Sequence, residues 1–277
     1  MRTRDGRWLR TMAAGPVGTD ESQAGGDLVV LEAGLGFSGL YWEPVQRLLA
    51  QQFRVVAYDR SGFGGSAADP HPRTLDRLAA DLVDVVGAFP HERLILVGHS
   101  WGGPIVRAAA RTLRADGLVL VDPTDEHADL YFEDGTEARA RLNGRLSGVL
   151  ARVGLLRLAL HAMGTGLPGP VRAAAARASG TPAAAAASER EMLAFTGDLS
   201  ALRQTGWEPQ RVPVRLVSGI MPGLGEGEGR AQLVAAHRRT AQTNPDVTLV
   251  EATKSSHLVP LTEPGLVAQQ VEELLED

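Results

Sequence analysis

The chain has 277 residues, of which 44% are hydrophobic and 22% charged, with a net charge of −5 at pH 7. This composition is typical of a globular protein with a large apolar core. The acidic balance argues against nucleic acid or an anionic membrane as a partner. Cysteine is absent from the sequence, which excludes disulfides, a thiolate nucleophile and a zinc–cysteine site.

Neither a secretory signal nor a run of about 18 apolar residues is found, so we expect a cytoplasmic protein without a membrane-spanning helix. Lys254 is the only lysine among many arginines, a bias typical of a high-GC bacterial genome.

Strands and helices alternate through the first half of the chain. Short apolar or β-branched runs predict strands at 28–32, 53–58, 94–97 and 117–121. Helical spacing of apolar residues predicts helices at 42–52, 75–89 and 104–113. Nearly continuous apolar strands separated by helices indicate an α/β protein whose mostly parallel sheet is covered on both faces.

The alternation stops between residues 126 and 209, where the sequence predicts helices only, at 137–162, 170–179 and 183–203. The alanine-rich tract 171–187 is included because arginines interrupt it and alanine favours helix. A strand at 212–219, a helix at 228–241, a strand at 247–252 and a helix at 263–275 then resume the pattern.

We therefore predict a core domain made of residues 1–125 and 210–277. Residues 126–209 form a helical cap inserted after the strand that ends at Asp122. Because open parallel sheets bind ligands at the carboxyl ends of their strands, such a cap encloses the substrate.

The stretch LVGHSWGG at 96–103 contains a serine between glycines. Gly98 and Gly102 flank Ser100 at the G-x-S-x-G spacing, immediately after an apolar strand and before a helix. A strand-to-helix turn this tight exposes the hydroxyl above the sheet edge and requires neighbours without side chains. We therefore interpret Ser100 as a nucleophile.

Four stretches, LEAGLGFSG, YDRSGFGGS, VGHSWGG and SSHLVPLTEP, follow one another along the chain. With them the chain resembles the α/β-hydrolase fold family over essentially its whole length, and within it the general bacterial hydrolases related to proline iminopeptidases. The resemblance implies that Ser100 is the nucleophile and that His257 is the base, which takes and returns a proton. It also implies an oxyanion hole formed by the backbone N–H groups of Leu35 and Trp101.

The loop that supplies the first oxyanion donor departs from the family pattern. The family commonly has His-Gly-x there, whereas this chain has Ala33-Gly34-Leu35, which removes a side chain that usually braces the loop. Gly34 and Gly36 let the backbone come close to the substrate. Among the other histidines, His99 is expected to be structural. The remaining ones are expected at the surface or in the cap, namely His71, His91, His127, His161 and His237.

The acid of the expected triad is not at its usual place. The family supplies it after the strand that follows the cap, where this chain has Met221 or Pro222. Asp122, the last residue of VLVD, is our preferred candidate because its strand ends at the same edge of the sheet as the strand before Ser100. Asp125 and Glu226 are the alternatives.

The resemblance implies a serine hydrolase that cleaves a small ester, lactone or amide through an acyl-enzyme, with no metal and no organic cofactor. A lyase, a perhydrolase, an acyltransferase and a ligand-sensing receptor of the same fold are the alternatives. We expect a monomer or a homodimer whose partner is a small-molecule substrate. The apolar cap residues expected to line the pocket are Phe132, Met163, Met192 and Phe195. Acidic cap residues that could hold a peptide amine, but are expected on solvated helix faces, are Glu133, Asp134, Glu137, Glu189, Glu191 and Asp198.

Overall fold

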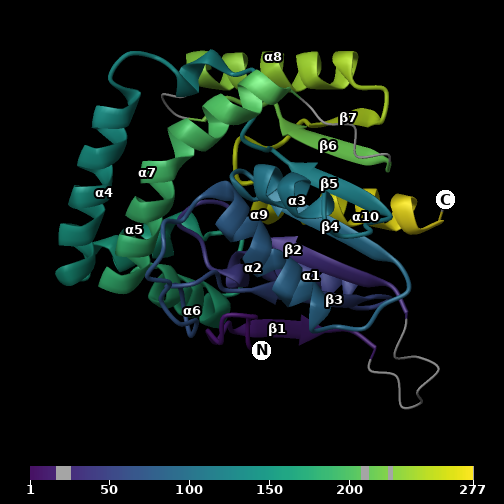
Figure 1. The fold of residues 1–277 in the computed structure, drawn as a ribbon, viewed down its shortest axis with the longest axis horizontal. Helices are drawn as coiled ribbons and strands as arrows, with labels where there is room; N and C mark the ends of the chain where they lie inside the picture. Colours follow the sequence, from purple (N-terminus) through teal and green to yellow (C-terminus); the bar gives the residue numbers. More distant parts are fainter. Residues whose placement is uncertain (17–25, 207–211, 224–226, 277) are drawn as a thin grey trace.

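A seven-stranded sheet runs through the centre of the protein (Figure 1). The computed structural model describes residues 1–16, 26–206, 212–223 and 227–276. The strand order is β1-β3-β2-β4-β5-β6-β7, and every neighbouring pair is parallel except β1 with β3. The strands are β1 (Thr11–Ala14), β2 (Leu28–Glu32), β3 (Arg54–Tyr58), β4 (Leu94–His99), β5 (Gly117–Val121), β6 (Val214–Gly219) and β7 (Val247–Ala252). The predicted mostly parallel α/β sheet is confirmed.

Helices cover both faces of the sheet, because successive residues of a strand point to opposite faces. Val30 and Leu96 pack against α2 and α3, whereas Val29 and Val97 pack against α1 and α10. Burial on both sides explains why the strand sequences are continuously apolar. The core helices are α1 (Glu43–Leu49), α2 (Leu75–Gly87), α3 (Gly102–Ala110), α8 (Gly227–Thr243), α9 (Val259–Thr262) and α10 (Pro264–Glu276).

Strand β1 is an addition to the predicted set. It lies at the edge of the sheet and pairs antiparallel with β3, with Met12 opposite Ala57. Two of its four residues, Ala13 and Ala14, are exposed. A short edge strand containing alanines has neither the alternation nor the β-branched residues that identify strands in a sequence.

Among the described residues, four α-helices lie between β5 and β6, in the segment predicted to form a cap. They are α4 (Thr136–Arg152), α5 (Leu155–Met163), α6 (Gly169–Ser179) and α7 (Pro182–Thr205). Helices α4 and α7 pack side by side at one side of the molecule (Figure 1). The alanine-rich tract is helical, and the predicted end of the cap at residue 209 lies outside the described residues.

The single helix predicted over 137–162 is wrong, since the chain forms two helices there. Gly154 has φ 78°, a left-handed conformation that ends α4 and turns the chain into α5. Within the described ranges, no single helix is long and apolar enough to cross a membrane. Helices α4 and α5 pass that test only as a pair, bent by 105° at their junction.

Candidate active site

Ser100 occupies a sharp turn between β4 and α3. Its φ is 53°, a left-handed conformation that costs energy for a residue with a side chain. Three backbone hydrogen bonds hold it there: its N–H donates to Val121 O at 3.0 Å, and its carbonyl accepts from Gly103 N at 2.9 Å and Thr124 N at 3.0 Å. The turn is therefore the strained strand-to-helix elbow predicted from G-x-S-x-G.

The two glycines of the motif are required by close packing. A Cβ on Gly98 would lie 2.3 Å from Gly102 O, because the last residues of β4 touch the first turn of α3. A Cβ on Gly102 would lie 2.5 Å from the backbone oxygen of Glu32 in β2. Both contacts are far below van der Waals separation, so the elbow has room only for glycine at these positions.

His257 and Asp122 are joined by a hydrogen bond. The loop after β7 carries His257, and its Nδ1 lies 2.7 Å from Oδ2 of Asp122, the fully buried residue that follows β5. Burial, the largest influence, acts to raise the pKa of Asp122. The hydrogen bond from His257 and nearby positive charge nevertheless hold that pKa below its ordinary value. An ionised Asp122 accepts the Nδ1 proton and leaves Nε2 as the basic nitrogen.

Asp122 has further partners that fix its carboxylate. The Oδ1 atom of Asp122 accepts a hydrogen bond from Gly219 N at 3.0 Å. The backbone of Asp122 is in a left-handed conformation, with φ 42°. Arg230 of α8 donates Nη1 to Oδ1 at 2.8 Å and to Oδ2 at 2.9 Å. Gly219 and Arg230 flank the region in which the family usually has its acid. In this chain they supply a backbone N–H donor and a guanidinium to Asp122 instead.

The alternative acids have other surroundings. Asp125 accepts from Thr240 Oγ1 at 2.6 Å and from His127 N at 2.8 Å, so it caps the loop after β5. Glu226 lies outside the described residues. Within the described residues no hydrogen bond joins Ser100 Oγ to His257, and catalytic hydrogen bonds are often long without substrate.

Two other histidines support this edge of the sheet. His99 Nε2 donates to the carbonyl of His257 at 2.8 Å, and burial lowers the pKa of His99 to about 3, so the ring is neutral. The expectation of a surface or cap position is wrong for His237, which is fully buried in α8. It donates Nε2 to Pro123 O at 2.8 Å and accepts from Ser218 Oγ at 2.8 Å. Its spacing of four residues from the buried Leu233 could have revealed this.

The loop after β2 packs directly on Ser100. A Cβ on Gly34 would lie 3.1 Å from Ser100 Cβ and 3.0 Å from His99 Nδ1. Gly36 has φ 83°, and a Cβ there would lie 3.7 Å from Ser188 Oγ of α7. Leu35, the expected oxyanion donor, therefore lies between a residue that touches Ser100 and one that faces α7.

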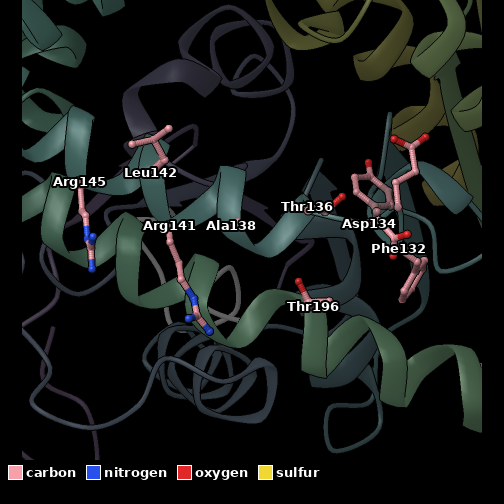
Figure 2. A pocket seen from close by; sticks show the side chains of 11 residues that line it. Phe132, Asp134, Thr136, Ala138, Arg141, Leu142, Arg145 and Thr196 are labelled. Carbon is pink, nitrogen blue, oxygen red and sulfur yellow. The ribbon is translucent and has the colours of Figure 1, made fainter.

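Three of the four expected pocket residues lie together: Phe195 belongs to the core cluster that contains Trp101, and Phe132 and Met192 pack against that cluster. Phe195 packs on Trp101 at 4.6 Å between ring centroids, and Met192 packs against the same core. Phe132 lines a cavity of about 680 Å³ between α4, α7 and the loop before α4 (Figure 2). Met163 does not line this cavity and is 48% exposed at the end of α5, so its role in an apolar pocket stays a prediction.

The lining of this cavity does not include Ser100, His257, Leu35 or Trp101. Figure 2 shows Arg141, Arg145 and Asp134 among its lining side chains. Among the residues that the structure describes, no group of three or more His, Asp or Glu side chains is arranged to hold a metal ion.

Comparison with known proteins agrees with this architecture. A family model described as "Alpha/beta hydrolase family" matches residues 29–270. Two curated relatives are both called "Putative carbamate hydrolase RutD". The protein from Caulobacter sp. strain K31 is 42% identical over 99 residues, which is 34% of this chain and 36% of that protein. The protein from Agrobacterium fabrum is 33% identical over 111 residues, 38% of this chain and 42% of that protein.

Solved structures match over nearly the full length. A thermophilic esterase from Thermogutta terrifontis has a TM-score of 0.69 and 22% identity, covering 99% of this chain and 95% of its own. An alpha/beta hydrolase fold protein from Burkholderia ambifaria has a TM-score of 0.71 and 20% identity, covering 97% and 95%. Fold and elbow define an α/β protein with a serine at a sheet-edge turn. The chain belongs to the alpha/beta hydrolase family.

The packing at Gly98 leads to a stability prediction. Gly98→Ala should lower the free energy of unfolding by about 2 kcal/mol or more, because its methyl group overlaps the Gly102 carbonyl and cannot be relieved by a side-chain rotation. Gly87→Ala, in α2 with no neighbour near its Cβ position, is the matched control and should be neutral or stabilising by up to about 1 kcal/mol. Urea denaturation of both variants measures the difference. Equal effects would contradict the close-packing explanation.

The contact between Asp122 and His257 leads to a kinetic prediction. Asp122→Asn should lower kcat by about 10⁴-fold, because the amide cannot stabilise the imidazolium or hold the required tautomer. Asp125→Asn, which changes a buried loop cap three residues away, should keep kcat within a few-fold. Steady-state kinetics on an ester substrate, with melting temperatures as a check on folding, compare the two. A dead Asp125→Asn beside an active Asp122→Asn would move the acid.

Proposed function

We propose that the protein is a serine hydrolase that cleaves a small ester, lactone or amide through an acyl-enzyme on Ser100. The observation that carries the proposal is the strained Ser100 elbow at the same sheet edge as His257, whose Nδ1 is bound to an ionised Asp122. A serine hydroxyl needs such a base to become nucleophilic.

In the proposed reaction, Ser100 Oγ attacks the substrate carbonyl while His257 Nε2 takes its proton. The resulting oxyanion accepts hydrogen bonds from the backbone N–H groups of Leu35 and Trp101. The imidazolium then gives the proton to the leaving alcohol or amine as the carbonyl–heteroatom bond breaks. Water, deprotonated by His257, attacks the acyl-enzyme, and collapse of the second tetrahedral intermediate releases the acid and returns the proton to Ser100.

The names of the curated relatives add carbamates to the candidate substrates. A carbamate has the same electrophilic carbonyl as an ester or amide, so the same steps apply. Because those matches span about a third of each chain, the substrate class rests on the site and not on the relatives. The alternatives are a lyase, a perhydrolase, an acyltransferase and a ligand-sensing receptor. Assays with thioesters, acyl acceptors and peroxide, together with a measurement of tight ligand binding, distinguish them from a hydrolase in the same preparation.

Labelling tests the nucleophile. A fluorophosphonate probe should modify Ser100, located by peptide mass mapping, and Ser100→Ala should abolish both labelling and ester turnover with little change in melting temperature. Ser147→Ala, on the cap helix α4, is the control and should retain both. Turnover that survives in Ser100→Ala would remove this serine from the mechanism.

The position of Phe195 beside Trp101 predicts an effect on acyl-chain length. Phe195→Ala opens space near the proposed oxyanion donor and should raise kcat/KM for a long-chain relative to a short-chain p-nitrophenyl ester by about tenfold. Leu202→Ala removes a buried side chain from the same helix and the same core. It should cost stability, by about 2 to 5 kcal/mol, without changing that ratio. If both variants leave the ratio unchanged, Phe195 does not limit the acyl site.

A further inference from the structure

Arg60 lies buried between the loop after β2 and the cap. It follows β3 by two residues, in the stretch YDRSGFGGS, and is 1% exposed. A guanidinium has five N–H donors, and all five are used here. Nε and one Nη2 donor bind Glu191 at 3.1 and 2.9 Å, and one Nη1 donor binds Glu32 at 2.6 Å.

The two remaining donors bind backbone carbonyls of the loop that precedes Leu35. Nη1 donates to Ala33 O at 2.5 Å and Nη2 to Gly34 O at 2.9 Å. A trans peptide unit is planar, so its C=O and N–H point in opposite directions. Gly34 C=O and Leu35 N–H belong to one peptide unit. By binding the carbonyl, Arg60 sets the direction in which the Leu35 N–H points.

The loop after β2 needs contacts from other parts of the protein to hold its conformation. Gly34 has no side chain to restrict rotation of the following peptide, and its Cβ position is closed by Ser100 and His99. The family's usual histidine is replaced by Ala33, which carries only a methyl group. Arg60 supplies, from the loop after the neighbouring strand β3, hydrogen bonds that hold this loop.

Of the two carboxylates that bind Arg60, Glu32 belongs to β2 and Glu191 comes from the cap. Glu191 lies in α7 and is fully buried, so the expectation of a solvated helix face is wrong for this residue. Burial alone would raise the pKa of Glu191, but the charges of Arg60 and Arg73 outweigh it and lower that pKa. The same helix also contacts Gly62, two residues after Arg60, where a Cβ would lie 2.7 Å from Ala187 Cβ.

We propose that Arg60 is a positioning residue that orients the oxyanion donor, the Leu35 N–H group. Glu191 of the cap holds Arg60 in place, so the cap contributes to the geometry of the oxyanion hole. The inference rests on the proposed function, since it assigns Leu35 N–H as an oxyanion donor. Arg60 orients the Gly34–Leu35 peptide, and Glu191 fixes the guanidinium only while α7 is seated on the core.

Arg60→Lys is the first test, with Arg73→Lys as its matched control. Both arginines are 1% exposed and both bind Glu191, but Arg73 binds Asp81 and not the loop. A lysine keeps the charge but cannot hold both loop carbonyls and Glu191. Arg60→Lys should lower kcat by about 10²-fold, as for loss of one oxyanion donor, with KM changed by less than about threefold. Inhibition by a trifluoromethyl ketone, whose adduct carries an oxyanion, should weaken by the same factor, while the pH limb of kcat/KM stays in place.

Arg73→Lys should lose a similar amount of thermal stability but keep kcat and ketone inhibition within about threefold. A folded Arg60→Lys with unchanged kcat, or equal losses of kcat in the two variants, would overturn the proposal. If Arg60→Lys does not fold, Glu191→Gln decides. This substitution keeps the shape of the Glu191 side chain but removes its charge. It should lower kcat about tenfold and weaken inhibition by the trifluoromethyl ketone by the same factor. Unchanged values in Glu191→Gln would overturn the coupling to the cap.

These outcomes are separate from failure of the proposed function. If Ser100 is labelled and required for turnover while Arg60→Lys retains full kcat, the chemistry stands and only the role of Arg60 falls. If Ser100→Ala retains turnover, the serine mechanism falls, and with it the oxyanion role on which Arg60 depends.

Discussion

The pairing of β4 with β5 determines where the candidate site forms. His99 lies opposite Val121, so the chain leaves both strands at the same level of the sheet, and the next residues are Ser100 and Asp122. Ser100 N donates to Val121 O across the pair, and Ser100 and Asp122 both have positive φ. A slip of one residue would turn every side chain of a strand to the opposite face, which burial on both faces forbids. The register that fills the core therefore also places Ser100 beside Asp122.

The loops around this edge are held mostly by buried polar contacts. Asp122 is shared between His257 and Arg230, and His99 holds the carbonyl of His257. Burying charges is costly unless they are paired and hydrogen-bonded, and such pairs contribute more to a defined geometry than to stability. Their positions fit that view, because each of these ion pairs and hydrogen bonds fixes a loop next to Ser100.

The cap and the core share one electrostatic cluster. Glu191 of α7 reaches Arg60 and Arg73, while Arg73 and Arg7 both contact Asp81 of α2. Removing one member of such a cluster leaves the others buried without a counter-charge. Helix α7 is therefore joined to the core at the loop that faces Ser100. Under the proposed role of Arg60, the position of α7 affects the geometry of the site.

The sequence by itself determined the α/β class, the succession of the main strands along the chain and the elbow at Ser100. Their signals are local: continuous apolar runs, helical periodicity and glycines at fixed spacing. It also favoured Asp122 over Asp125, through the position of a strand end. The break at Gly154, the burial of His237 and the brace at Arg60 were decided only in the tertiary structure. Each depends on a partner far away in the chain, such as Pro123 for His237 or Glu191 for Arg60. No local sequence pattern indicates which charged residues become buried and paired, and so take a structural role.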